Sequence, residues 1–103
     1  MDDFMKLLLE TFAEEARETV EALEKALLAL ERSESPTARE EHYAVLARRA
    51  HNLKGAAGAA GVTEIQSLSH ALEDGLLALR DTHGLPQPEM FDVLYAGVDA
   101  IRM

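Results

Sequence analysis

One histidine of this sequence, His51, has neighbours that suit it to nucleophilic chemistry. At about 100° per residue of an α-helix, Gly55 and Gly58 fall on the same side as His51, and Lys54 lies beside it one turn later. A neutral imidazole nitrogen is a nucleophile, and an ammonium group neutralises negatively charged oxygens. This combination indicates attack by His51 on a phosphoryl group, with Lys54 neutralising the phosphoryl oxygens.

A second pair of polar residues, His70 and Glu73, is spaced to share one helix face. Glu73 lies at the flank of an apolar stripe, where an antiparallel neighbouring helix would meet it. We expect its carboxylate to accept a hydrogen bond from one ring nitrogen of His51, leaving the other nitrogen as the nucleophile. The same carboxylate would stabilise the positive charge that develops on the ring. His70 is expected to hold Glu73 in turn.

The stretch from Gly55 to Gly61 is almost free of side chains. A glycine inside a helix costs roughly 1 kcal/mol relative to alanine, and here that cost arises at Gly55 and again at Gly58. Close helix packing is one explanation, but these two glycines lie on the His51 side rather than in the apolar stripe. We therefore predict a surface where a partner's active site closes over His51, formed by Gly55, Gly58 and Arg48.

Apolar residues recur every three or four positions in four segments, as in amphipathic helices, and no useful length alternates with a period of two. Short connections make consecutive helices antiparallel, which predicts an all-α, up-down four-helix bundle. The chain stops abruptly, and we interpret it as a domain cut before a fifth helix. The single predicted domain, 1–103, contains helices at roughly 3–32, 38–60, 64–83 and 88–102.

Capping residues mark several of the predicted helix ends. Asp2 and Asp3 suit the N-terminus of the first helix, and Gly61 suits the C-terminus of the second. Capping-box patterns at Thr37–Glu40 and Thr63–Gln66 are expected to open the second and third helices. The core positions expected on the four helices are Phe4, Leu8, Phe12, Ala16, Val20, Leu23, Leu27, Leu30; Tyr43, Leu46, Ala50, Leu53, Ala57, Ala60; Ile65, Leu68, Leu72, Leu76, Leu79; and Phe91, Leu94, Val98, Ile101.

Composition narrows the class of protein. The 103 residues carry a formal net charge of −9 and include no cysteine, which excludes disulfides, thiolate zinc sites and cysteine nucleophiles. Such a negative field repels nucleic acids and anionic lipids. No apolar run approaches the ~20 residues of a membrane span, and the N-terminus lacks the pattern of a secretory signal. We expect a cytoplasmic protein without nucleic-acid partners or membrane insertion.

The sequence contains no glycine-rich nucleotide loop, no metal-binding carboxylate pair and no arginine finger. We therefore expect no cofactor in this domain and no enzymatic activity of its own. ATP and Mg²⁺ would be bound by a partner, and both the phosphoryl donor and the next acceptor would be other domains or proteins.

The run from Arg49 to Gly58, RAHNLKGAAG, resembles the phosphorylation motif of histidine-phosphotransfer (HPt) domains, H-x-[LI]-K-G-x-x-G. His70-Ala71-Leu72-Glu73 stands where chemotaxis-type histidine kinases of the CheA family carry a His-x-x-Glu pair, and the first helix is similar too. The resemblance implies that His51 is phosphorylated, that Lys54 is its electrostatic partner, that Glu73 is bonded to its ring, and that His70 is a supporting neighbour.

The resemblance also implies partners. The donor would be an ATP-binding kinase domain of the same or another chain, so that the parent chain would be a histidine protein kinase. The acceptor would be an aspartate on the receiver domain of a response regulator. Members of the family usually have a fifth helix after the bundle, and this sequence ends before one.

Two alternatives of other classes stay open. His51, His70 and Glu73 would be the three ligands of a metal centre in a helical bundle, although Lys54 beside them would repel a cation. In the second alternative, the chain is a helical bundle that only binds other proteins and is not phosphorylated. For the two remaining histidines, His42 and His83, we predict no functional role.

Overall fold

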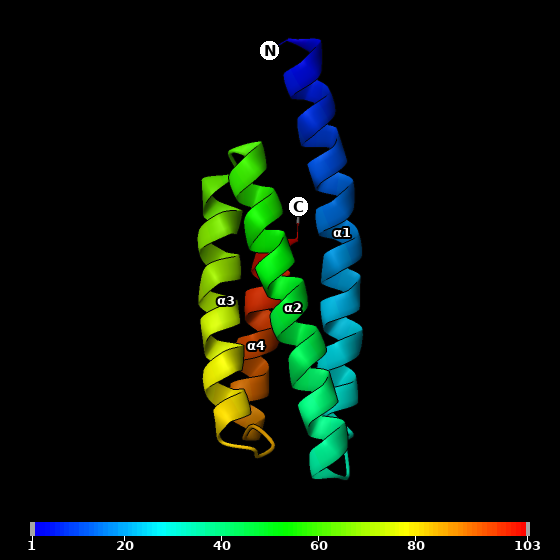
Figure 1. Cartoon of the computed structure of the whole chain (residues 1–103), viewed down its shortest axis with the longest axis vertical. Coiled ribbons are helices and arrows are strands. Elements are labelled where there is room, and N and C mark those ends of the chain that lie inside the picture. Colours follow the sequence, from blue (N-terminus) through cyan, green and yellow to red (C-terminus); the bar gives the residue numbers. More distant parts are fainter. Residues whose placement is uncertain (1, 103) are drawn as a thin grey trace.

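The computed structural model describes residues 2–102, which form four α-helices (Figure 1). In chain order these are α1 (Asp3–Glu31), α2 (Pro36–Ala60), α3 (Thr63–Asp81) and α4 (Pro88–Ile101). The helices alternate in direction, and the described residues contain no strand. The predicted all-α up-down bundle is confirmed, and each helix begins and ends within two residues of its expected boundary.

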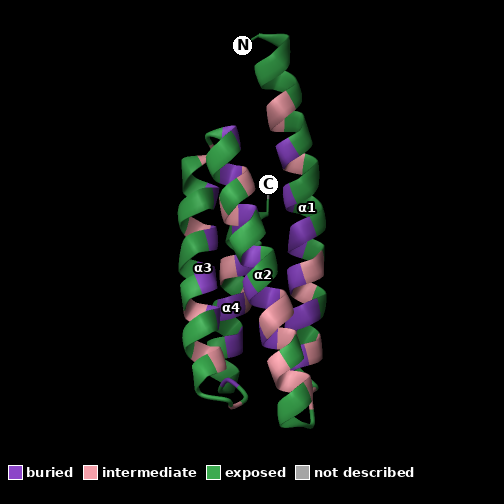
Figure 2. Cartoon of the chain, in the orientation of Figure 1, coloured by how far each residue is buried: buried purple, intermediate pink, exposed green. Residues whose placement is uncertain are grey.

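The core lies along the line where the four apolar stripes meet, and Figure 2 shows buried positions on the inward faces of the helices. Burial of this apolar surface contributes about 25 cal/mol per Å² and is the main force holding the helices together. α2 takes part with small residues, and Ala50 and Ala57 are completely buried. The largest fully buried apolar side chains are Tyr43, Leu23, Leu27, Leu30, Leu46, Leu53, Leu76, Ile101, Val20 and Val98.

The start of α1 extends beyond the rest of the bundle (Figure 1). α1 has 29 residues whereas α4 has only 14, so α4 ends before it reaches the first turns of α1. The expectation that Phe4 is a core residue is therefore wrong, because its side chain is 72% exposed. Leu8 is only partly buried. The whole molecule is elongated and measures 50 × 20 × 18 Å.

Two of the predicted caps are confirmed. Asp2 accepts a hydrogen bond from the backbone N–H of Met5 at 2.7 Å, which satisfies one of the free donors at the start of α1. Gly61 ends α2 in the left-handed conformation, with φ at 75°. Glycine adopts this conformation without the steric penalty that other residues have there.

The two predicted capping boxes are wrong. α2 begins earlier than expected, because Ser35 accepts a hydrogen bond from the N–H of Ala38 at 3.1 Å and Pro36 occupies the first turn. Val62 precedes α3 and makes no side-chain cap. The side chains expected to complete the boxes, Glu40 and Gln66, instead contact the opposite helix of the α2–α3 pair.

Candidate functional site

His51 lies on the outer face of α2 and its side chain is 62% exposed. Its Nδ1 atom is 2.7 Å from Oε2 of Glu73 on α3. A carboxylate can only accept hydrogen bonds, so the proton of a neutral ring resides on Nδ1. Nε2 then keeps its lone pair and is the nucleophilic nitrogen. The predicted contact between His51 and Glu73 is present.

Glu73 is a nearly buried carboxylate with two partners. Its Oε1 atom accepts a hydrogen bond from Nζ of Lys54 at 2.7 Å, while Oε2 faces His51. The hydrogen bond from Lys54, with a further one from His51, holds the pKa of Glu73 below its ordinary value, although burial alone would raise it. Glu73 therefore stays ionised at neutral pH. The sequence did not predict that Lys54 binds Glu73.

Side chains also join α2 and α3 on both sides of the His51–Glu73 pair. Towards the start of α2, Nε of Arg80 donates to Oε1 of Glu40 at 2.7 Å. Towards its end, the side chain of Gln66 lies over Gly58, where a Cβ atom would be only 2.8 Å from Nε2 of Gln66. These two contacts lie on either side of the His51–Glu73 pair along the helices.

His70 does not hold Glu73, and this expectation is corrected. Its Nε2 atom lies 3.4 Å from Oδ2 of Asp74, one turn further along α3, and its side chain is 60% exposed. Both oxygens of Glu73 already have partners in Lys54 and His51. In the described structure His70 is thus a solvent-facing neighbour that does not contact the carboxylate.

The predicted docking surface is only partly bare. Gly55 is exposed and a Cβ atom there would meet nothing within 4 Å, and Arg48 is also exposed. Gly58 is exposed too, but the side chain of Gln66 lies beside it, so that a Cβ atom there would be only 2.8 Å from Nε2 of Gln66. Asn52 and Ala59 are exposed and extend the surface next to Gly55, although we did not predict that they belong to it. Both residues lie within ~100° of His51 around the axis of α2, and this spacing could have predicted that they belong to the same surface.

Comparison with known proteins identifies the family of this four-helix chain. The family model of the Hpt domain matches residues 7–103. The chain belongs to the Hpt domain family. No solved structure gave a significant match.

Curated proteins similar to this Hpt domain include chemotaxis proteins. Chemotaxis protein CheA of Halobacterium salinarum is 38% identical over 102 residues, which cover 99% of this chain and 14% of that protein. CheA of Treponema pallidum is 34% identical over 92% of the chain and 11% of its own length. CheA of Bacillus subtilis is 30% identical over 95% of the chain and 14% of its own length. The chain thus spans about one seventh or less of the length of these relatives. As a member of the Hpt family it is a phosphotransfer domain, a phosphocarrier rather than a catalyst.

The geometry gives no support to a metal centre in this Hpt domain. Among residues 2–102, no three His, Cys, Asp or Glu side chains are placed to hold a metal ion. His51 and Glu73 meet, but His70 faces Asp74 instead of joining them. Lys54 binds the same carboxylate and places a positive charge where a metal would lie.

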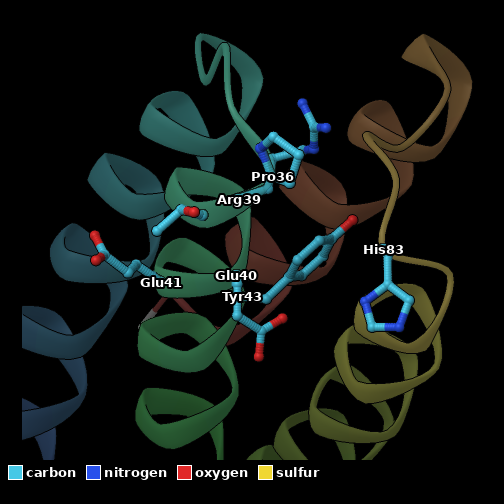
Figure 3. Close-up of a pocket in the computed structure, with 7 residues that line it drawn as sticks. Pro36, Arg39, Glu40, Glu41, Tyr43 and His83 are labelled. Atoms are coloured by element: carbon cyan, nitrogen blue, oxygen red, sulfur yellow. The ribbon is translucent and has the colours of Figure 1, made fainter.

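A cavity of about 400 Å³ lies far from His51, at the start of α2 and the end of α3 (Figure 3). The cavity is separate from the site at His51, because Glu40, which lines the cavity, lies ~16 Å before His51 along α2. His83 contributes to its wall directly after α3 and has a positive φ of 58°. His42 is partly buried on α2. The residues that line this cavity are Pro36, Thr37, Arg39, Glu40, Glu41, Tyr43 and His83.

Replacement of Gly55 by alanine is expected to stabilise the Hpt domain. The added methyl group meets no other atom, and alanine is favoured over glycine inside a helix by roughly 0.5–1 kcal/mol. Urea unfolding followed by circular dichroism measures the free energy of unfolding. The matched control is Gly61→Ala, which must destabilise the domain because φ is 75° there. A loss of stability in Gly55→Ala would show that a contact forms at this position.

Proposed function

We propose that His51 accepts a phosphoryl group from an ATP-bound kinase domain and passes it to an aspartate of a response-regulator receiver domain. The observation that carries this proposal is the 2.7 Å contact between Nδ1 of His51 and Glu73 on a ring that is 62% exposed. One nitrogen is held by the protein, and the exposed ring leaves the other to react.

The proposed reaction needs no proton to leave the ring. The lone pair on Nε2 of His51 attacks the γ-phosphorus of ATP while the bond to the leaving oxygen breaks and ADP departs. The ring becomes positively charged, and ionised Glu73 stabilises that charge through the Nδ1–H bond. In the second step the carboxylate of an acceptor aspartate attacks phosphorus, the P–N bond breaks, and neutral His51 is restored.

Lys54 is proposed to act in both steps. Its ammonium group is held by Glu73 and its side chain is 27% exposed, so its position beside the reacting ring is fixed before a partner arrives. Positive charge at this place lowers the energy of the transition state, where negative charge spreads over the phosphoryl oxygens.

Substitution of Lys54 by alanine is expected to slow transfer by about five- to tenfold at low ionic strength and by about twofold at 0.5 M salt or above, because salt screens charges at this partly exposed site. The rate of phosphoryl transfer at several salt concentrations measures the effect. Lys54→Arg is the matched control, which retains the charge. A defect that does not depend on salt would indicate lost packing instead.

The partners follow from what this domain lacks. ATP and Mg²⁺ are proposed to bind to the kinase domain, which belongs to the same chain or to another one, and the parent chain is proposed to be a histidine protein kinase acting in the cytoplasm. The similarity to CheA proteins supports this assignment. In the part of the chain that the structure describes, no helix has the length and apolarity that a bilayer span requires.

The direct test is incubation of this domain with the catalytic core of Bacillus subtilis CheA, ATP and Mg²⁺. The expected product carries phosphate that is labile in acid and stable in base, as phosphohistidine is. Chemical labelling with phosphoramidate runs in parallel, since it needs no recognition between proteins. If neither donor adds such phosphate, the phosphoacceptor function is wrong and a plain interaction bundle becomes the better interpretation.

A further inference from the structure

Ser69 on α3 carries a hydroxyl group that is completely buried, with 0% of the residue exposed. Within residues 2–102 its Oγ atom makes no hydrogen bond. A serine inside a helix ordinarily faces solvent or bonds the carbonyl group four residues earlier, and Ser69 does neither. A buried polar atom without a partner costs free energy, which alanine would avoid in the same space. The hydroxyl group is therefore expected to find its partner in another state of the domain.

The neighbour of Ser69 on its own helix is Glu73. The two residues are four apart and both are buried on the inward side of α3. Helical side chains lean towards the N-terminus of their helix, which brings the carboxylate of Glu73 over the turn that contains Ser69. Lys54 follows His51 by one turn on the antiparallel helix α2, so it approaches Glu73 from the same side as Ser69. Its Nζ atom donates to Oε1 of Glu73 at 2.7 Å.

The proposed phosphorylation changes what Lys54 has to bind. Oε2 of Glu73 faces Nδ1 of His51, so a phosphoryl group on Nε2 lies on the far side of the ring from the carboxylate. Lys54 therefore has to leave Oε1 in order to bond the phosphoryl oxygens. Glu73 is nearly buried, and a carboxylate oxygen that loses its partner there is costly. A second donor at Oε1 would remove this cost.

We propose that Ser69 is a positioning residue, whose hydroxyl group donates to Oε1 of Glu73 when Lys54 turns to the phosphoryl group. The inference rests on the function proposed above and adds how the carboxylate is held during the reaction. Rotation of the Ser69 side chain from one staggered position to another moves Oγ without moving the helix. Glu73 then keeps two hydrogen bonds and stays directed at Nδ1 of His51. Ser69 itself contacts neither ATP nor phosphorus.

The first test uses the unphosphorylated domain, in which Lys54→Ala removes the competing donor. With Lys54 present, Ser69→Ala is expected to leave the midpoint of urea unfolding unchanged or to raise it, because the hydroxyl group has no partner to lose. In the Lys54→Ala background the hydroxyl group takes over Oε1 of Glu73. The same substitution is then expected to lower the midpoint by about 0.5–1 M. Equal effects of Ser69→Ala in the two backgrounds would overturn the inference.

The second test measures the rate at which phosphoramidate phosphorylates the domain, which involves no partner protein. Ser69→Ala is expected to slow this rate about three- to fivefold although the fold is no less stable, a combination that a purely structural role would not produce. Ser67→Ala is the matched control, because Ser67 is exposed and lies ~120° around α3 from Glu73. It is expected to react at the wild-type rate.

Equal rates for Ser69→Ala and the wild type, or equal losses in Ser69→Ala and Ser67→Ala, would also overturn the inference. A wild-type domain that gains no phosphate from phosphoramidate or from the kinase would contradict the proposed function itself. The two failures are distinguishable, because the unfolding measurements on Ser69 and Lys54 involve no phosphate.

Discussion

Replacement of His51 by glutamine is expected to abolish phosphorylation by either donor and to leave the fold intact. The side chain is 62% exposed and takes no part in the core, so its removal creates no cavity. The substitution disturbs only the hydrogen bond with Glu73, and a single hydrogen bond contributes about 0.5–1.5 kcal/mol to stability. Phosphate incorporation is measured by intact mass, while helical content and urea unfolding are followed by circular dichroism.

His70→Gln is the matched control for this experiment, because the two histidine side chains are almost equally exposed, at 60% and 62%. His70 does not contact Glu73, so its variant is expected to be phosphorylated at the wild-type rate. If His51→Gln still gained acid-labile phosphate from the kinase, or if His70→Gln lost it, the site would be wrongly assigned.

Substitution of Glu73 by alanine is expected to slow phosphorylation by about ten- to a hundredfold without ending it. Loss of the carboxylate frees the ring of His51 to rotate and to populate the tautomer in which Nε2 carries the proton. It also removes the negative charge that stabilises the positively charged ring. The measurement is the single-turnover rate at saturating kinase. Unchanged kinetics would remove Glu73 from the mechanism.

Glu73→Gln separates the shape of this residue from its charge. Its amide oxygen can still accept the hydrogen bond from Nδ1, so a phosphorylation rate close to wild type would assign the role of Glu73 to orientation alone.

The pH dependence of stability gives a second measurement, because Lys54 and His51 hold the pKa of Glu73 below its ordinary value of 4.5. Wild-type Glu73 therefore stabilises the fold fully above about pH 4.5, and this advantage over Glu73→Gln disappears as the pH falls through the lowered pKa.

The bundle was predictable because the spacing of apolar residues in each helix marks the face that is buried in the core. The stripe of α4, from Phe91 to Ile101, is buried throughout as expected. Caps that depend only on adjacent residues, at Asp2 and Gly61, were also predicted. Glu73 could be placed beside His51 because it lies on the flank of α3 and α2 runs antiparallel to α3, so that the side chain of Glu73 must point towards α2.

The errors arose where residues distant in sequence compete for the same side chain. Glu40 was expected to cap α2, but Arg80 on α3 binds it. Gln66 was expected to cap α3, but its side chain lies beside Gly58 of α2. The predicted boundaries already made the first helix about twice as long as the fourth, but the apolar pattern of α1 continues past the end of the bundle, so Phe4 was wrongly placed in the core. His70 has the predicted spacing from Glu73, yet the ring nitrogen Nε2 of His70 lies next to the carboxylate of Asp74 instead.

The elongated shape described above also affects how the molecule tumbles. A body of 50 × 20 × 18 Å rotates faster about its long axis than end over end. The amide N–H bonds of an α-helix lie nearly along the helix axis, and all four axes follow the long dimension of the molecule. Transverse ¹⁵N relaxation rates are therefore expected to be high and nearly uniform over the helices, so that any amide near residue 51 that departs from this level reports local motion rather than bond orientation.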